Sequence, residues 1–382
     1  MAECISVFLR RFRRKTNVLS TFCTTNQESY MSFYKGKKIL ITGHTGFKGA
    51  WLCHALLTMG AKITGYALTP PTTPNLYSLC NLDKQITSIT ADIRDLQTLQ
   101  TTLQTTKPDL VIHMAAQPIV RESYVNPHYT YETNVMGTVN ILESIRHCPS
   151  VKSFLNVTTD KVYHNNEWEW GYRETDPLNG YDPYSNSKSC SELVTMSYKN
   201  AFFPDGVCAI STARAGNVIG GGDFAKDRII PDCIRAAQKG ESIFLRNPHS
   251  VRPYQHVLEP LMAYLKIAQA QYENGKYAGA YNVGPDEYDC VTTGHLADLF
   301  CKAYGEDMRW ETEFKGDYHE ANLLKLDCSR IKNTFNWRPR WNVQDAVKKT
   351  VEWTKAYING DDVIQLMDKQ LNEYLKGIDL QH

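Results

Sequence analysis

The chain has 382 residues and a formal net charge of +1 at pH 7, so it can bury a large core and offers no electrostatic case for nucleic acid as its main partner. No stretch of about 18 unbroken apolar residues occurs, so we expect neither a transmembrane helix nor a membrane partner. The eleven cysteines are scattered, odd in number and free of CxxC pairs, which predicts reduced thiols and a cytoplasmic protein. No cluster of metal-ligating residues is found, so no metal is expected.

The first 34 residues differ in composition from the rest of the chain. Few acids occur here, and the basic residues lie among apolar ones. The basic residues are Arg10, Arg11, Arg13, Arg14 and Lys15. This composition is compatible with an organelle transit peptide. The alternative is a disordered extension in which Met31 is the working start. Either way, residues 1–34 are expected to precede the folded protein.

Residues 37–43 begin with charged side chains and continue as an apolar run, which predicts a buried parallel strand. Glycines stand at positions 43, 46 and 49, and residues 50–59 have helical character. Glycines at a strand-to-helix turn allow a pyrophosphate to approach the free N–H groups of the helix N-terminus. We therefore predict a dinucleotide-binding turn made of Gly43, His44, Thr45, Gly46, Phe47, Lys48 and Gly49.

Residues 62–68 predict a second strand. In many such folds an acid near the end of this strand binds the ribose hydroxyls of the dinucleotide. Here Leu68 is followed by Thr-Pro-Pro, and no arginine is present to receive a 2′-phosphate. The choice between NAD and NADP therefore stays open, with NAD favoured.

Two further strands are predicted at residues 86–91 and 109–115. Asp92 follows the first and can accept a hydrogen bond from an adenine amino group, whereas Asp95 is expected to cap the next helix. Small or short polar residues at the end of the second strand would let the backbone approach a cofactor. The additional cofactor-binding candidates are Asp92, Ile93, Ala115, Ala116 and Gln117.

A long helix is predicted over residues 126–146, with Asn134 in its interior. Asparagine is a poor former of helix interiors, so a specific polar contact is expected for it, with a solvent-facing position as the alternative. Strand signals at 152–159 and 207–213 flank a helix that begins at Pro183 and runs to Phe203. The alternation of strands and helices predicts an α/β fold: a Rossmann-type, doubly wound parallel sheet with ligands at the carboxyl ends of its strands.

Tyr184 and Lys188 are four residues apart and therefore share one face of the predicted helix. A lysine ammonium beside a phenol favours the phenolate and is expected to lower the tyrosine pKa toward working pH, which makes Tyr184 a candidate general base for an alcohol. The preceding strand ends at Thr158, Thr159, Asp160 and Lys161, which would lie at the same edge of the sheet. The alternative for such a short pattern is an aromatic anchor with a solvated lysine.

The rhythm of strand and helix changes near residue 216, where a glycine-rich loop begins. Arg228 and Arg252 lie among glycine and aromatic residues and could grip a diphosphate bidentately; ordinary surface arginines are the alternative. A helix at 258–273 and a short strand at 281–284 follow, with another helix at 343–357. The predicted organisation is an extension (1–34), an NAD-binding domain (35–215), a nucleotide-sugar-binding region interleaved with the sheet (216–360) and a tail (361–382).

Several long motifs in the same order resemble the extended short-chain dehydrogenase/reductase family, and within it the nucleotide-sugar 4,6-dehydratases that act on CDP-glucose. The similarity covers roughly residues 35–360. Lys161 and His44 indicate this branch, because related dTDP-glucose enzymes carry Thr-Asp-Glu where this chain has Thr159-Asp160-Lys161. The matching motifs are GHTGFKG (43–49), MAAQPIVRESY (114–124), TTDK (158–161), YSNSK (184–188), RAGNVIGGGDF (214–224), RIIPD (228–232), RPYQHVLEP (252–260) and HEANLLKLDCSR (319–330).

The resemblance implies that a nucleotide sugar, CDP-glucose, loses water to become a 4-keto-6-deoxy sugar, with bound NAD returning its hydride. It implies catalytic roles for Thr159, Asp160, Lys161, Tyr184 and Lys188, of which Tyr184, Lys188, Thr158 and Asn134 would also contact the cofactor. Lys161 would be either the base at C5 or a stabiliser of the enolate. The implied substrate-binding residues are Arg121, Asn217, Arg228, Arg252 and His256. A homodimer through two long helices is common in the family.

Other functions stay open from the sequence. An epimerase or a dehydratase for another nucleotide sugar would use the same fold and the same Tyr-Lys pair, although the Asp160-Lys161 pair favours elimination. A dinucleotide-binding protein without catalysis is a further alternative. The presence of Thr159, Tyr184 and Lys188 together argues against it.

Overall fold

The computed structural model describes residues 31–204, 206–305, 308–312 and 321–376, so most of the expected N-terminal extension lies outside the described residues. A seven-stranded parallel sheet forms the centre, in the order β11-β6-β5-β4-β1-β2-β3. Its strands are β1 (Lys38–Thr42), β2 (Lys62–Ala67), β3 (Thr87–Thr90), β4 (Leu110–His113), β5 (Ser153–Thr159), β6 (Ala209–Ala215) and β11 (Ala280–Val283). The order runs outward in both directions from β1 and β4, which confirms the predicted doubly wound fold.

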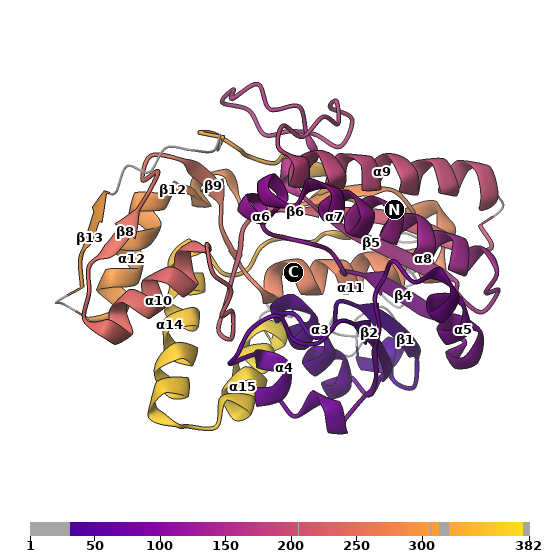
Figure 1. Ribbon diagram of the computed structural model, residues 1–382, viewed down its shortest axis with the longest axis horizontal. Coiled ribbons are helices and arrows are strands. Elements are labelled where there is room, and N and C mark those ends of the chain that lie inside the picture. Colours follow the sequence, from indigo (N-terminus) through magenta and orange to yellow (C-terminus); the bar gives the residue numbers. More distant parts are fainter. Residues whose placement is uncertain (1–30, 205, 306–307, 313–320, 377–382) are drawn as a thin grey trace, which may run out of the picture.

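The two faces of the sheet are covered by different helices (Figure 1). Leu40, Val111 and Phe154 join one core, and the neighbouring positions Ile39, Ile112 and Leu155 join the other, because successive side chains of a strand point to opposite faces. The first core is completed by α5 (Leu96–Thr106), α8 (Gly137–Arg146) and α9 (Pro183–Phe202). The second is completed by α3 (Phe47–Thr58) and α11 (Leu258–Glu273).

The helix expected over 126–146 is not continuous. The structure has α7 (Pro127–Tyr131), a π-helical turn η3 (Glu132–Met136) and then α8. A π turn inside a helix opens one extra residue into the hydrogen-bond pattern and often marks a functional position. Asn134 lies in this turn and is buried. The prediction of a single regular helix was therefore wrong, because the side-chain bonds that Asn134 makes elsewhere are not visible in its local sequence.

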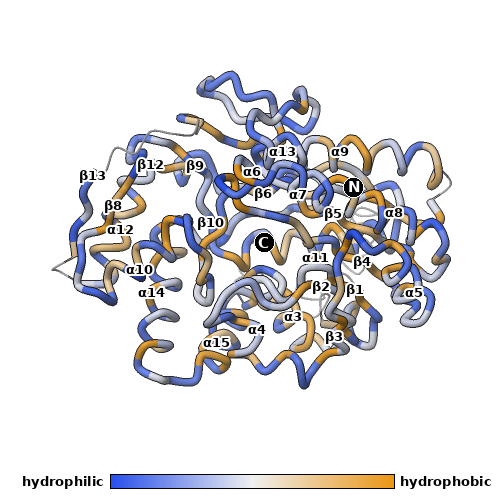
Figure 2. The backbone as a smooth tube through the Cα atoms, viewed as in Figure 1, coloured by the Kyte–Doolittle hydropathy of each residue, from blue (hydrophilic) through white to orange (hydrophobic). Residues whose placement is uncertain are grey.

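Short elements complete the first half of the chain. They are α4 (Leu76–Leu79), η2 (Leu82–Lys84), α6 (Val120–Val125) and η4 (Asp160–Val162). The loop of residues 164–182 is largely hydrophilic, whereas helix α11 in the middle of the molecule carries long hydrophobic stretches (Figure 2). Within the described part of the chain, none of the helices combines the length and the apolar character needed to span a bilayer.

Much of the chain after β6 builds a smaller region beside the sheet (Figure 1). In its described part, three two-stranded sheets pair β10 with β7, β12 with β9 and β13 with β8. Helices and a separate apolar core accompany them. This region contains β7 (Val218–Ile219), α10 (Ile229–Lys239), β8 (Ile243–Leu245), β9 (Val251–Pro253), β10 (Gln255–His256), η6 (Glu287–Asp289), β12 (Cys290–Thr292), α12 (Thr293–Tyr304), β13 (Trp310–Thr312) and α14 (Val343–Asn359). The turn η5 (Gly275–Tyr277) and the helix α13 (Ser329–Phe335) come from the same half of the chain but lie against α11 and β11.

The segment expected to be a tail contains a further helix, α15 (Val363–Lys376). The Tyr374 hydroxyl donates to Glu259 Oε2 at 2.7 Å, which ties α15 to α11. His54 Nε2 lies 3.0 Å from Asp368 Oδ1, which ties α15 to α3. The helix therefore packs into the same core as α3 and α11, a position that a local sequence pattern does not reveal.

The glycine-rich loop after β7 lies against α14. A Cβ atom built on Gly221 would lie 2.0 Å from Cγ of Trp353, and Trp353 is buried. The carbonyl oxygen of Gly221 accepts a hydrogen bond of 2.9 Å from Trp51 Nε1 on α3. Only glycine allows the loop to pass this close to the indole, so the loop is clamped between α3 and α14.

We expect Gly221→Ala to lower the free energy of unfolding by about 1–3 kcal/mol, because an extra methyl group in a packed core forces its neighbours to move. Gly275→Ala is the matched control, since a Cβ atom at Gly275 meets nothing within 4 Å. The control should stay within about 0.5 kcal/mol of the parent. Chemical denaturation of the three proteins checks this, and equal stability of all three would contradict the close packing of the loop.

Candidate active site

The turn between β1 and α3 has the shape that a dinucleotide pyrophosphate requires. Gly43 has φ of +77°, and a Cβ there would lie 2.8 Å from the backbone nitrogen of Ala115. A Cβ on Gly49 would lie 2.2 Å from the carbonyl oxygen of Gly43. Gly46 caps α3 without a side-chain hydrogen bond, and the first turn holds no acid. The free N–H groups and the helix dipole therefore fit a negatively charged diphosphate.

His44 lies behind this turn. Its ring is fully buried, and Nε2 lies 2.7 Å from Ser88 Oγ on β3. Burial lowers the pKa of His44 to about 4, so the ring is neutral near pH 7. A Cβ on Gly65 would lie 2.4 Å from the ring, so Gly65 on β2 makes the room that His44 occupies. Nothing in the local sequence signals this pairing of His44 with Gly65.

Thr45, Phe47 and Lys48 complete the turn. Thr45 Oγ1 donates to the Leu68 carbonyl at 3.0 Å, which joins the turn to the end of β2. Phe47 packs against the core that α3 and α11 complete. Lys48 Nζ donates to the Tyr264 hydroxyl at 3.0 Å. Burial, with help from Arg228 and Lys188, lowers the pKa of Lys48 to about 7.

The ends of β3 and β4 hold the remaining cofactor candidates. Asp92 is paired with Arg94 at 2.8 Å, and the hydrogen bond from Arg94 lowers the pKa of Asp92. Ile93 is a buried core residue. The predicted cap is confirmed, since Asp95 accepts from the Thr98 N–H at 3.0 Å.

Asn134 holds the segment Ala115–Gln117 in place. Asn134 Oδ1 accepts from the N–H of Gln117 at 2.8 Å, and Nδ2 donates to the Gln117 carbonyl at 3.1 Å. The same Nδ2 donates to Ser187 Oγ at 2.8 Å, on α9. The expected polar contact of Asn134 is therefore present, and it links the end of β4 to the helix that carries Tyr184.

The carboxyl end of β5 and the start of α9 meet at the centre of the site. Asp182 caps α9 by accepting from the Ser185 N–H at 2.9 Å, and Pro183 occupies the first turn. The Tyr184 side chain is hydrogen-bonded to that of Thr159. Thr159 Oγ1 in turn donates to Asp160 Oδ1 at 2.9 Å. One short chain of hydrogen bonds therefore joins a phenol, a hydroxyl and a carboxyl group.

Asp160 is 1% exposed, and burial raises its pKa. Its Oδ2 atom has no hydrogen-bond partner among the described residues. A buried carboxyl oxygen without a partner is uncommon and costly when charged. A protonated Asp160, ready to donate to a ligand, is consistent with both observations. Lys161 follows directly and is partly exposed, and its charge counteracts the rise of the Asp160 pKa.

The expected effect of Lys188 on Tyr184 is not what the structure shows. Burial raises the pKa of Tyr184 to about 12, because the phenolate is poorly solvated there. Burial also lowers the pKa of Lys188 to about 8. Lys188 Nζ donates to the Val157 carbonyl at 3.3 Å, beneath the end of β5. The prediction of a lowered tyrosine pKa was wrong because desolvation outweighs the neighbouring charges.

The five substrate candidates are placed differently. Arg252 acts electrostatically on Asp160 and donates to the Val251 carbonyl at 2.9 Å. Arg228 acts on Tyr184 and is paired with Asp223 at 3.1 Å. Both guanidinium groups therefore lie close enough to the catalytic side chains to act on them electrostatically.

The other three have different neighbours. Arg121 is 3.6 Å from Asp227, which also pairs with Arg246. Asn217 is half-buried, and its carbonyl accepts from the Gln255 N–H at 2.9 Å. His256 is fully buried between Trp51 and Trp341, with ring centroids 6.1 and 4.8 Å away. The His256 ring therefore belongs to the core and has no surface for a ligand.

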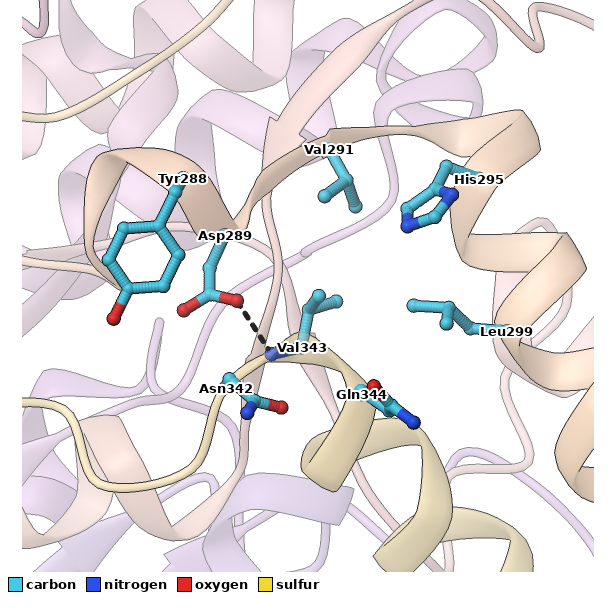
Figure 3. Close-up of a pocket in the computed structure, with 8 residues that line it drawn as sticks. All are labelled: Tyr288, Asp289, Val291, His295, Leu299, Asn342, Val343 and Gln344. Atoms are coloured by element: carbon cyan, nitrogen blue, oxygen red, sulfur yellow. Dashed lines mark hydrogen bonds between the residues drawn. The ribbon is translucent and has the colours of Figure 1, made fainter.

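A shallow pocket of about 270 Å³ lies elsewhere, at the start of α14 (Figure 3). Asp289 there accepts from the Val343 N–H at 3.0 Å, so its carboxyl group already serves the helix. The pocket shares no residue with the site described above. Across the described residues, no group of histidine, cysteine and acidic side chains is placed to hold a metal ion.

Comparisons with known proteins agree with this arrangement. The family described as GDP-mannose 4,6 dehydratase matches residues 40–350. A CDP-glucose 4,6-dehydratase of Salmonella typhimurium is 45% identical over 353 residues, which cover 91% of this chain and 98% of that protein. The human dTDP-D-glucose 4,6-dehydratase is 26% identical over 83% of this chain and 89% of that protein.

Solved structures show the same fold. The UDP-glucose 4-epimerase of Thermotoga maritima superposes with a TM-score of 0.74 at 21% identity, over 84% of this chain and 99% of that one. The dTDP-glucose 4,6-dehydratase of Bacillus anthracis, solved in complex with NAD, gives a TM-score of 0.72 at 21% identity, over 86% and 100%. From the extent of the family match and the 45% identity, this chain belongs to the nucleotide-sugar 4,6-dehydratase family.

Proposed function

We infer that this protein is a CDP-glucose 4,6-dehydratase, a hydro-lyase that converts CDP-glucose to CDP-4-keto-6-deoxyglucose with NAD. The observation that carries the inference is the hydrogen-bonded chain from Tyr184 through Thr159 to the buried Asp160, beside Lys188. It offers one group for alcohol oxidation and another for loss of water. The 45% identity to the Salmonella CDP-glucose enzyme supports the choice of cytidine nucleotide.

Bound NAD would accept a hydride from the sugar and later return it. The nicotinamide ring of oxidised NAD would also carry a positive charge. The turn at Gly43, Gly46 and Gly49 would hold its diphosphate. Lys188 would hydrogen-bond the ribose next to the nicotinamide. The segment Ala115–Gln117, kept in place by Asn134, would line the same side of the cofactor.

Oxidation at C4 falls to Tyr184 and Thr159. Tyr184 would take the C4 hydroxyl proton, while Thr159 hydrogen-bonds the same oxygen. Because burial raises the pKa of Tyr184 to about 12, positive charge close to the phenol is needed to favour the phenolate. Arg228 already acts in this direction. Lys188, four residues along the same helix, would add a second positive charge once the cofactor and the substrate are bound.

Loss of water falls to Asp160 and Lys161. The C4 ketone acidifies the C5 proton, and the C6 hydroxyl must be protonated as it leaves. Asp160 is the acid for that hydroxyl, because its pKa is raised and its Oδ2 atom has no partner in the part of the chain that the structure describes. Lys161 would remove the C5 proton or stabilise the enolate that results. Arg228 and Arg252 would hold the diphosphate of the substrate, since both lie close enough to the catalytic group to act on its charges.

We also propose that the protein forms a homodimer through the outer faces of α8 and α9. Large apolar side chains are exposed on α9 and in the turn η3 that leads into α8: Leu193 at 47% and Met196 at 51% on α9, with Met136 at 51% in η3. Helix α9 lies at the edge of the molecule (Figure 1). A second copy of the same helix pair would cover these side chains.

The nine cysteines within the described residues are free thiols, which fits a reducing compartment, and we propose the cytosol.

The first test is a product assay with CDP-, dTDP-, UDP- and GDP-glucose in parallel. We expect CDP-glucose to yield a 4-keto-6-deoxy product, which absorbs in strong base, whereas an epimerised sugar does not. Tyr184→Phe should lower turnover by at least ~10²-fold, because it removes the acid–base group. Preference for another nucleotide sugar would contradict CDP-glucose as the substrate, and an epimer as product would contradict dehydration as the reaction. Near-normal turnover of Tyr184→Phe would overturn its role.

Asp160→Asn separates the two halves of the reaction. The amide cannot protonate the C6 hydroxyl, so product formation should fall ~10²–10⁴-fold. The oxidation at C4 and the removal of the C5 proton do not need this acid. In D₂O, mass spectrometry of the recovered substrate should therefore still detect deuterium at C5, whereas Tyr184→Phe should block both exchange and product. Equal loss of exchange and product in Asp160→Asn would show that Asp160 is needed before the elimination.

The dimer is tested by Leu193→Glu combined with Met196→Glu. Two charges on this face should give a monomer by analytical ultracentrifugation, with the circular dichroism of the parent. Phe244→Glu is the matched control, because Phe244 on β8 is 56% exposed but distant from α9 in Figure 1. A dimer that survives the double substitution, or a parent protein that is monomeric, would contradict the proposed interface.

A further inference from the structure

Glu192 is a buried acid that contacts the end of β5 and the neighbouring strand β6. It lies on α9, 3% exposed, one turn after Lys188 on the same face of the helix. Its Oε1 atom accepts from Thr158 Oγ1 at 2.5 Å, at the end of β5. Its Oε2 atom accepts from Arg214 Nη2 on β6 at 2.9 Å. Both carboxylate oxygens are therefore satisfied, and the group is held in one place.

The Arg214 guanidinium is equally confined. It is 4% exposed, and besides Glu192 it donates to the Tyr163 hydroxyl at 2.8 Å and to the Glu174 carbonyl at 3.1 Å. Tyr163 in turn donates to Asn282 Oδ1 at 2.6 Å, on β11. This buried network joins α9 to three neighbouring strands. A network of this kind holds its members rigidly because each unpaired group would be costly in the interior.

The charges around Lys188 come from several elements. Lys48 on α3 contributes a like charge. His113 on β4 is buried, and its pKa is lowered to about 3, so it carries no charge near neutral pH. The neighbour from β5 is the uncharged carbonyl of Val157. Glu192 is the acid whose charge raises the pKa of Lys188, against the effect of burial.

We propose that Glu192 is a positioning residue of the active site: it keeps the Lys188 ammonium charged and fixes Thr158 at the end of β5. Thr158 directly precedes Thr159, so a shift of the strand end would move the hydroxyl that bonds Tyr184. Glu192 reaches the reacting groups through these neighbours and not by touching the substrate. The inference rests on the proposed function, because it assigns the charge of Lys188 a part in cofactor binding and turnover.

Glu192→Gln keeps the shape of the side chain and removes its charge. The pKa of Lys188 should then fall, so the loss of activity and of NAD affinity on the alkaline side should begin at lower pH. For two charges about one helical turn apart in a protein interior, the displacement is on the order of one pH unit. The measurements are kcat/KM for CDP-glucose and the dissociation constant of NAD by calorimetry, each from pH 6 to about 10, a range that brackets the lysine.

Two variants separate charge from structure. Glu192→Asp keeps the charge. The pH at which its activity and its NAD affinity fall on the alkaline side (the alkaline limb of each pH profile) should therefore stay near that of the parent, even if its rate is lower. Glu352→Gln makes the same chemical change on α14, where Glu352 pairs with Lys369, and should move neither profile. If Glu192→Gln fails to fold because Arg214 is left unpaired, the double variant Glu192→Gln/Arg214→Met carries the test, with a smaller displacement in the same direction.

The outcomes are distinct. An alkaline limb that moves in Glu192→Gln but not in Glu192→Asp or Glu352→Gln supports the inference. Limbs that coincide in all folded variants overturn it. A parent protein that binds NAD but makes no keto sugar from any of the four nucleotide sugars would defeat the proposed function alone, since the pH profile of NAD binding still decides the role of Glu192.

Discussion

The active site depends on the close contact between β5 and α9. Short polar side chains on one face of the helix bond directly to the strand: Asn156 Nδ2 donates to Ser191 Oγ and to Thr195 Oγ1, each at 2.9 Å. Ser189 Oγ donates to the Val162 carbonyl at 2.7 Å, just beyond the strand end. Because all these groups are buried, sliding the helix along the strand would leave several unpaired at once. The relative position of Thr159 and Tyr184 follows from this register.

Burial determines the chemistry of that site as much as proximity does. The same desolvation raises the pKa values of Asp160 and Tyr184 and lowers those of Lys48 and Lys188. Burial therefore favours the neutral form of each group. It also moves the pKa values of Asp160, Lys48 and Lys188 closer to neutral pH, where these groups can exchange protons. The charges that remain act on these groups at short range and with little screening by water. Such a site responds strongly to the addition or removal of a single charge.

The smaller region is attached to the sheet by contacts that come from far along the chain. Glu259 on α11 accepts from the N–H groups of Arg340 and Trp341 and from the Tyr374 hydroxyl. The loop at Gly221 lies between Trp51 and Trp353. These contacts join α3, α11, α14 and α15 into one support beneath the glycine turn. Arg228 and Arg252, which the small region contributes, are thereby presented to residues of the sheet.

The sequence by itself determined the alternation of strands and helices. The apolar runs at 37–43 and 152–159, the three glycines at 43, 46 and 49 and the four-residue spacing of Tyr184 and Lys188 each follow from local periodicity, and they were enough to predict the doubly wound sheet and the edge at which its ligands bind. Long motifs added the family. The same resemblance placed Asp160 and its neighbours Thr159 and Lys161 among the catalytic residues.

Only the tertiary structure decided the rest. Gly65 leaves the space that the His44 ring fills, and Lys48 donates a hydrogen bond to Tyr264. In the π turn, Asn134 forms hydrogen bonds with Gln117 and Ser187. The protonation of Tyr184 and the placement of His256 in the core depend on how completely other segments cover them. These features arise between residues far apart in the chain, and the free energy of a charge depends on the whole of its surroundings. A local pattern of residues contains neither.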